Sequence, residues 1–294
     1  MPARGSPRKG AELPPALEGA DSLSTGHQAQ RMRVRYAKRH RMRFASHRDI
    51  ARVLERALRR AQVPVAFSAG FSPHPKISYT GAAPTGVASE AEYCELTLAE
   101  PMDPERLRER LDEAMPEGID ILTVAPAAAG GLADRLEASE WRIELPGVDP
   151  DDAAAAVAAF LAAERIEVER LTKKGRRRFD ARSPVFLLDV DRRAATEQQE
   201  TYAILRLIVR HTTPVVRPDD VVTGLRQIAD LAPPSSTKMT RLAQGPLDED
   251  SGTIADPLAA DNAASESGAT VVSAHAGSAS ARSGSGNVSA PQGL

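Results

Sequence analysis

RFASHRDIARVLERALRRAQVPVAFSAGFSPHPKIS, residues 43–78, contains a helix with clear start and stop signals, followed by a constrained loop. Ser46 stands where a helix N-cap is expected, and Asp49 follows three residues later as the second member of a capping box. Pro64 ends the helix. Apolar residues recur at the spacing of one helix face: Ile50, Val53, Leu54, Ala57, Leu58 and Ala61. The pattern predicts an amphipathic helix that packs this face on a sheet.

The opposite face of the predicted helix is basic. It carries Arg48, Arg52 and Arg59, with Arg56 at its edge. Like charges four residues apart on an exposed helix cost about 0.2–0.5 kcal/mol per pair. The arginines therefore hint at an anionic partner such as RNA, although a solvated charged face explains them as well.

The loop after the helix has unusually restricted geometry. Gly70 permits positive φ, and the two prolines that flank His74 restrict both Ser72 and His74. Phe71 is expected either to stack on a base or to fill the core. His74 could fix the loop, contact a ligand beside Lys76, or act as an acid or base.

The order of predicted elements favours an α+β fold of tandem ferredoxin-like (split βαβ) halves. Strands are expected near 32–44, 65–68, 76–81, 91–98 and 119–124, with helices after Ser46 and Asp103. The pattern β-α-β-β-α then returns, its last strand replaced by irregular chain. The expected divisions are a first half at 31–130, which carries the arginine helix, and a second half at 137–244.

Composition sets the outer limits of the fold. Residues 1–30 and 245–294 are rich in small and polar residues, so both are expected to be disordered tails. The net charge of −2 conceals a basic front, with twelve Lys or Arg residues between Arg31 and Arg60, and an acidic tail. A single cysteine, Cys94, excludes an internal disulfide and any cysteine-only metal site. Without an apolar run of membrane-spanning length or a secretory signal, we expect a cytoplasmic protein and no membrane contact.

Several motifs together resemble one known family, the bacterial radical SAM-associated (radical SAM-linked) domain of unknown function, in its stand-alone form. The matching stretches are RFASHRD (43–49), VLERALRRA (53–61), SAGFSPHPKIS (68–78), GV (86–87) and SEAEY (89–93). The resemblance extends over about residues 31–244. It implies no established activity. A radical S-adenosylmethionine (SAM) enzyme needs three closely spaced cysteines to hold its cluster, and this chain has only Cys94, so the stand-alone form implies either a separately encoded radical SAM enzyme as a partner or an independent role.

Three functional hypotheses follow. The first is an accessory or RNA-binding module without catalysis of its own, whose binding residues are Arg48, Arg52, Arg56, Arg59, Gly70, Phe71, His74 and Lys76. The second is a metal-independent ribonuclease or hydrolase that uses His74 with His47 or Lys76. The third is a protein–protein scaffold. No metal-ligand spacing or phosphate-binding glycine loop is present, so no metal or cofactor is expected, and the sequence does not determine an oligomeric state.

Overall fold

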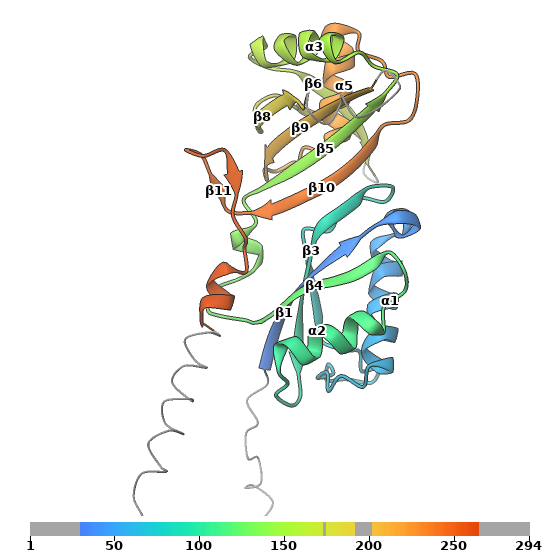
Figure 1. Cartoon of the computed structure of the whole chain (residues 1–294), viewed down its shortest axis with the longest axis vertical. Helices are drawn as coiled ribbons and strands as arrows, with labels where there is room; N and C mark the ends of the chain where they lie inside the picture. The colour runs from blue at the N-terminus through green and yellow to red at the C-terminus, as the bar shows by residue number, and fades with distance from the viewer. Residues whose placement is uncertain (1–29, 173–174, 192–201, 265–294) are drawn as a thin grey trace, which may run out of the picture.

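The computed structural model describes residues 30–172, 175–191 and 202–264 of the 294-residue chain. The expected N-terminal tail lies outside the described residues except for its last residue, Gln30, and so does the part of the C-terminal tail from 265 onward. The described residues form a mixed α/β fold around a large mixed sheet (Figure 1). None of the helices described here combines the length and the apolar run needed to cross a bilayer.

The first half of the sheet has the strand order β4-β1-β3, with β2 paired to β3, and all neighbours are antiparallel. Its elements are β1 (Gln30–Lys38), η1 (His40–Phe44), α1 (His47–Arg60), β2 (Ile77–Thr80), β3 (Ala88–Leu98), α2 (Pro104–Glu113) and β4 (Ile119–Pro126). The predicted first strand is too long. It ends at Lys38, because His40 takes a positive φ of 48° and starts a 3-10 turn.

Helix α1 forms for the reasons that the sequence indicates. The Ser46 hydroxyl accepts a hydrogen bond from the Asp49 backbone N–H, and the Asp49 carboxylate accepts one from the Ser46 N–H, which completes the capping box. The buried residues Ile50, Leu54, Ala57 and Leu58 pack with the strands of the first half in one hydrophobic cluster. The arginines are left on the solvent side.

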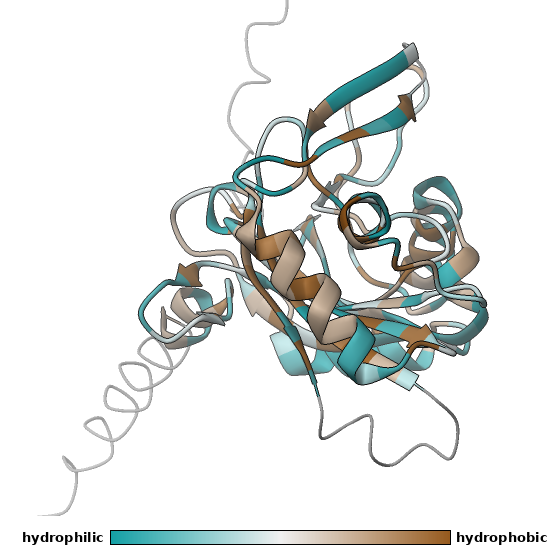
Figure 2. Cartoon of the chain, turned by 90° about the horizontal axis from the view of Figure 1, so that it is seen from above, coloured by the Kyte–Doolittle hydropathy of each residue, from teal (hydrophilic) through white to brown (hydrophobic). Residues whose placement is uncertain are grey.

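The second half has the strand order β10-β5-β9-β8, again antiparallel throughout. Its elements are β5 (Ala138–Pro146), α3 (Pro150–Ala162), β6 (Glu167–Thr172), β7 (Gly175–Asp180), β8 (Val185–Val190), β9 (Tyr202–Arg210), α5 (Pro218–Ala229) and β10 (Lys238–Gly245). The expectation of irregular chain after α5 is wrong, because β10 pairs with β5 along nearly its whole length. Strands β6 and β7 form a separate hairpin, which stands away from the large sheet (Figure 2).

The two halves join where β10 runs parallel to the start of β3, through the pairs Thr240↔Ala88 and Arg241↔Ser89. Buried polar side chains lie at this seam. The Arg241 guanidinium forms a salt bridge with Glu92 and donates to Ser89 Oγ at 3.3 Å. Lys38 Nζ donates to the Pro84 carbonyl at 3.1 Å, and burial lowers the pKa of Lys38. The seam is thus polar, between two apolar clusters.

Residues 245–264 are not a disordered tail, contrary to expectation. They form the two-stranded ribbon of β11 (Leu247–Asp248) and β12 (Thr253–Ile254), followed by a helical turn at 259–264. Asp261 in this turn is fully buried and accepts hydrogen bonds from Arg33 Nη1 at 2.7 Å and Arg135 Nη1 at 2.9 Å. An acidic residue that the sequence assigns to the tail therefore anchors the chain on the first half.

Candidate functional site

The predicted arginine face exists on α1. Arg48, Arg52, Arg56 and Arg59 are all exposed. Their acidic partners are distant: Arg52 lies 3.9 Å from Asp49, and Arg59 lies 3.8 Å from Glu55, with both guanidinium side chains more than 60% exposed. Arg48 and Arg56 form no ion pair within the part of the chain described here. Pairs of this kind contribute between zero and about 1 kcal/mol, so the positive charge of the face is largely unneutralised.

The loop after α1 is the tip of a narrow hairpin. The Ser68 N–H donates to the His74 carbonyl at 2.9 Å, and the Lys76 N–H donates to the Ala66 carbonyl at 2.8 Å. Gly70 has a φ of 125°, which favours glycine, and its surroundings are open. Phe71 at the tip is fully exposed, so its expected alternative role as a core residue is wrong.

The structure gives His74 a role in fixing this hairpin. Its Nδ1 lies 2.9 Å from Ser68 Oγ, and its backbone N–H donates to the same oxygen at 3.1 Å. The two prolines and this double contact hold the loop in one shape. Lys76 is exposed, and no described carboxylate forms an ion pair with it.

His47 belongs to a different neighbourhood. Its ring packs edge-on against Tyr79, with centroids 4.9 Å apart. No hydrogen bond, ion pair or ring contact connects His47 with His74 or Lys76, so the structure does not assemble the histidine pair of the nuclease hypothesis. Among the described residues, no group of three His, Cys, Asp or Glu side chains is placed to hold a metal ion.

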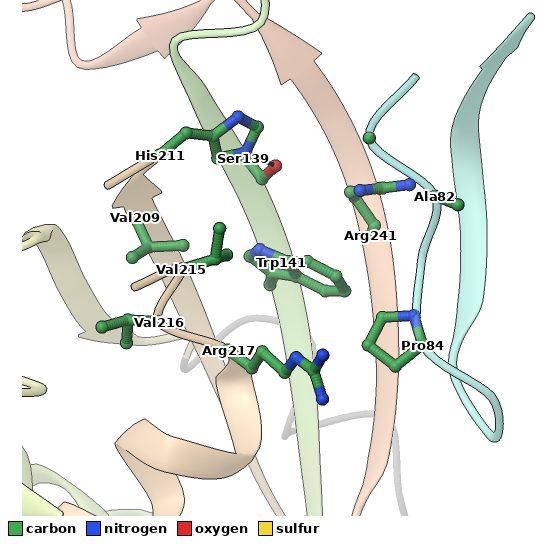
Figure 3. Close-up of a pocket in the computed structure, with 11 residues that line it drawn as sticks. Ala82, Pro84, Ser139, Trp141, Val209, His211, Val215, Val216, Arg217 and Arg241 are labelled. Atoms are coloured by element: carbon green, nitrogen blue, oxygen red, sulfur yellow. Dashed lines mark hydrogen bonds between the residues drawn. The ribbon is translucent and has the colours of Figure 1, made fainter. Parts of the chain in front are cut away.

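A second location, at the seam, is a partly open pocket of about 280 Å³ (Figure 3). One wall is the 81–84 segment of the first half, and the other is the face of β5, β9 and β10 with the chain leading into α5. The lining residues are Gly81, Ala82, Pro84, Ser139, Trp141, Val209, His211, Val215, Val216, Arg217 and Arg241. None of them is acidic, and two are arginines.

Trp141 is the central side chain of this pocket, and its indole N–H lacks a partner. The ring lies under the Arg241 guanidinium, 5.4 Å from ring centre to Cζ. Its Nε1 is buried, and no described residue provides it with a hydrogen-bond acceptor. A buried donor left in this state costs about 1–3 kcal/mol, and tryptophan N–H groups ordinarily find a partner. The pocket therefore contains a hydrogen-bond donor for which the described residues provide no acceptor.

His211 and Ser139 form one end of the pocket. His211 Nδ1 lies 2.7 Å from the Leu136 carbonyl, which can only accept, so this nitrogen carries the proton. Burial lowers the pKa of His211 and keeps the ring neutral, so Nε2 accepts the Ser139 hydroxyl at 2.6 Å. The pair has the hydrogen-bond relation of a nucleophile and its base. Ser139 is only 1% exposed, however, so the pair serves to fix the wall.

No pattern in the sequence indicates this pocket. The chain has one tryptophan, which is a weak signal by itself, and Arg241 lies about 150 residues from its partners in the first half. Glu90 pairs with Arg39 and Glu92 with Arg241.

The β6–β7 hairpin carries another basic surface, which the predictions from sequence do not include. Arg176, Arg177 and Arg178 are exposed along β7. Arg176 and Arg178 both lie 3.1 Å from the single carboxylate of Glu169. This surface is partly neutralised, in contrast to α1.

Comparison with known proteins gives a family but no activity. Residues 31–218 match the model of a family described as "Uncharacterized protein conserved in bacteria (DUF2344)". That description does not mention radical SAM enzymes, so it supports the resemblance only at the level of an uncharacterized bacterial family. No curated protein matches the chain. A solved structure described as "Crystal Structure of an Unknown Protein from Galdieria sulphuraria" is 15% identical, with a TM-score of 0.21, and covers 74% of this chain and 100% of its own.

Proposed function

Because the chain belongs to the family of uncharacterized proteins conserved in bacteria (DUF2344), we propose a function from its own surface: it is an RNA-binding accessory module without catalysis of its own. The binding surface comprises the exposed arginines of α1 and the hairpin loop at 68–76. RNA is held mainly through its phosphates, because aromatic residues are few.

The contrast between structural and unpaired arginines carries this proposal. Arg33, Arg39 and Arg241 are each held by at least one carboxylate at 3.2 Å or less, and they serve the fold. The α1 arginines have no comparable partner, although their like-charge spacing disfavours the helix slightly. Packing and capping explain α1 without them. An anion outside the chain would neutralise them.

The hairpin adds the second element of single-strand recognition. Phe71 is presented on a tip that Gly70, the prolines and the Ser68–His74 contacts hold rigid. Base stacking on such a ring contributes about 1–3 kcal/mol and tolerates any base. His74 and Lys76 then supply polar and cationic contacts on the same hairpin.

The proposal includes a tandem ferredoxin-like interpretation of the fold, with halves at 31–130 and 137–244. Its support is the repeated strand order. Numbered within each half, and with the β6–β7 hairpin treated as an insertion, both halves run 4-1-3-2. Ferredoxin-like folds often present RNA to a basic groove or sheet face, which is an analogy at the level of the fold.

A filter-binding titration of total RNA at low salt tests the proposal. We expect the double variant Arg52→Glu/Arg59→Glu to bind about tenfold more weakly, or worse, because two phosphate contacts become repulsive. Arg226→Glu is the matched control: Arg226 is an exposed arginine on α5, and its reversal should leave binding unchanged. Absence of RNA binding by the wild type, or equal binding by the double variant, would overturn the proposal.

The partnership with a separately encoded radical SAM enzyme is part of the same proposal. Cys94 is fully buried, and burial raises its pKa to about 12, so it is a packed thiol rather than a cluster ligand. A pull-down from the protein's own cells, with and without RNase, separates a direct protein partner from one bridged by RNA. Loss of every partner on RNase treatment would contradict the direct partnership.

A further inference from the structure

We propose that the pocket around Trp141 binds a small planar anion, namely one aromatic ring that carries a hydrogen-bond acceptor and a single carboxylate or phosphate. This site is separate from the arginine face of α1, and the inference does not depend on RNA binding. It rests on an unpartnered donor, a guanidinium with no carboxylate partner among the described residues, and the shape of the walls.

The unpartnered donor is Trp141 Nε1. Trp141 is 5% exposed and lines the pocket, while its Nε1 has no acceptor among the described residues. The other polar groups of the pocket do not satisfy it. Ser139 and His211 bond each other, and His211 also donates to Leu136. A ring nitrogen or carbonyl oxygen of a ligand would provide the missing acceptor.

The charge is that of the Arg217 guanidinium, an exposed group that acts on the Asp220 carboxylate at a distance but pairs with no carboxylate among the described residues. Arg241 is already occupied by Glu92, Ser89 and Gln244, so it contributes structure rather than binding capacity. Arg217 forms no salt bridge in the part of the chain described, and Figure 3 shows its side chain reaching toward Trp141 and Pro84. Its backbone N–H, in contrast, is satisfied by Asp220 at 2.7 Å. A free guanidinium at a pocket without acidic lining selects an anionic group.

The walls limit the ligand to a thin, small body. Val209, Val215 and Pro84 are apolar, and neutral His211 adds no charge at the other end. The volume of about 280 Å³ lies just below the range of roughly 300–1,000 Å³ that is usual for ligand pockets, which suits one ring with one substituent group. The 81–84 wall is itself held in place, because the Ala83 N–H donates to Glu92 Oε2 at 3.0 Å. The pocket is therefore preformed, and an occupant would touch both halves of the molecule.

The single tryptophan makes the site directly observable, because the full chain has one indole N–H signal in a proton–nitrogen correlation spectrum. Four probes separate the requirements: nicotinate and 3-pyridyl phosphate have ring, acceptor and anion; nicotinamide lacks the anion; inorganic phosphate lacks the ring. We expect one or both of the complete probes to move the indole signal downfield in a saturable manner. Nicotinamide and inorganic phosphate should bind at least about tenfold more weakly, because each lacks a main contact. Which complete probe binds identifies the anionic group as phosphate or carboxylate.

Arg217→Ala should weaken binding of the complete probe about tenfold or more, the usual effect of losing one charge-assisted hydrogen bond. Arg226→Ala, on α5 but outside the pocket, is the control and should bind as the wild type does. The proposal is overturned if no probe moves the indole signal. It is also overturned if nicotinamide or inorganic phosphate binds as tightly as the complete probe, or if Arg217→Ala retains wild-type affinity. The Arg52→Glu/Arg59→Glu variant should keep this site, so failure here and failure of the RNA proposal are distinguishable.

Discussion

Arg241 and Glu92 are each less than 5% exposed, and they bind each other across the seam between the two halves. Removing one partner of such a pair leaves a buried charge without compensation, which costs about 3–5 kcal/mol. Replacing both with apolar residues can be nearly neutral. Side chains at this seam therefore control how the two halves stay together.

The first prediction concerns this pair. Arg241→Leu should lower the free energy of unfolding by about 3–5 kcal/mol, and the double variant Arg241→Leu/Glu92→Leu should recover part of the loss. Urea denaturation of the three proteins measures both changes. Equal stability of the single and double variants would show that the two charges do not compensate each other.

The second prediction concerns His211, whose pKa burial lowers from the ordinary value of 6.5. Below about pH 6.5 the unfolded chain binds a proton that the folded chain does not, so stability falls as the pH falls. The wild type should lose up to about 1.4 kcal/mol per pH unit more than His211→Gln in that range. Thermal unfolding between about pH 7.5 and about pH 5.5, one unit on either side of 6.5, compares the two slopes. Parallel slopes would mean that His211 titrates normally.

The residues that the sequence predicts correctly are those whose partners are close along the chain. Ser46 and Asp49 are three residues apart, so their capping box follows from local pattern. The partner of Arg33 is 228 residues away, and no local pattern indicates it. The same distance problem conceals the pocket, whose two arginines and tryptophan come from separate segments of the second half.

Helix α5 packs closely against α3 and against the residue before β6 at Gly224, which has no side chain. A Cβ at this position would lie 2.8 Å from Phe160 Cε2 and 3.1 Å from Ile166 Cγ2. Alanine favours a helix by about 1 kcal/mol relative to glycine, but overpacking costs about 1–3 kcal/mol. At these distances the cost of overpacking outweighs the gain in helix propensity.

We therefore expect Gly224→Ala to lower the free energy of unfolding by about 1–2 kcal/mol in spite of its helix propensity. Denaturant unfolding measures the change, with the exposed neighbour Thr223→Ala as control. A stabilised Gly224→Ala protein would show that Phe160 and Ile166 yield easily, so that the packing is looser than the distances indicate.

Elements with strong periodicity could be predicted, and those defined by distant pairing could not. The apolar stripe of α1 and the alternating residues of β3 place them correctly. The last strand, β10, was missed because its sequence KMTRLAQG alternates weakly. Its place in the sheet comes from pairing with β5, about 100 residues earlier.

At the scale of the whole molecule, the C-terminal turn closes the first half. Asp261 holds Arg33 and Arg135, and it also accepts the Ala128 N–H at 2.8 Å. Leu258 beside it is fully buried. The segment at 245–264 therefore extends the fold beyond the boundary that composition suggests, because the residues that hold it are far away in the sequence.

Asp261→Ala should cost about 3–5 kcal/mol, because Arg33 remains buried with only Glu95 as its acidic partner. Asp250→Ala, an exposed residue of the same acidic stretch, should change stability by less than about 0.5 kcal/mol. Chemical denaturation distinguishes the two variants. Similar small effects from both would mean that the turn contributes little to the fold.

The salt dependence of RNA binding tests the central claim most directly, because it counts the phosphates that α1 neutralises. With four arginines of α1 and Lys76 of the hairpin in contact with a single strand, log affinity should fall with log salt concentration at a slope of about −3.5. Replacing Arg48, Arg52, Arg56 and Arg59 with glutamine should leave only the slope of about −0.7 that Lys76 contributes, while Arg226→Gln leaves the slope unchanged. A slope that the fourfold variant retains would contradict the account, because the phosphates would then be bound elsewhere.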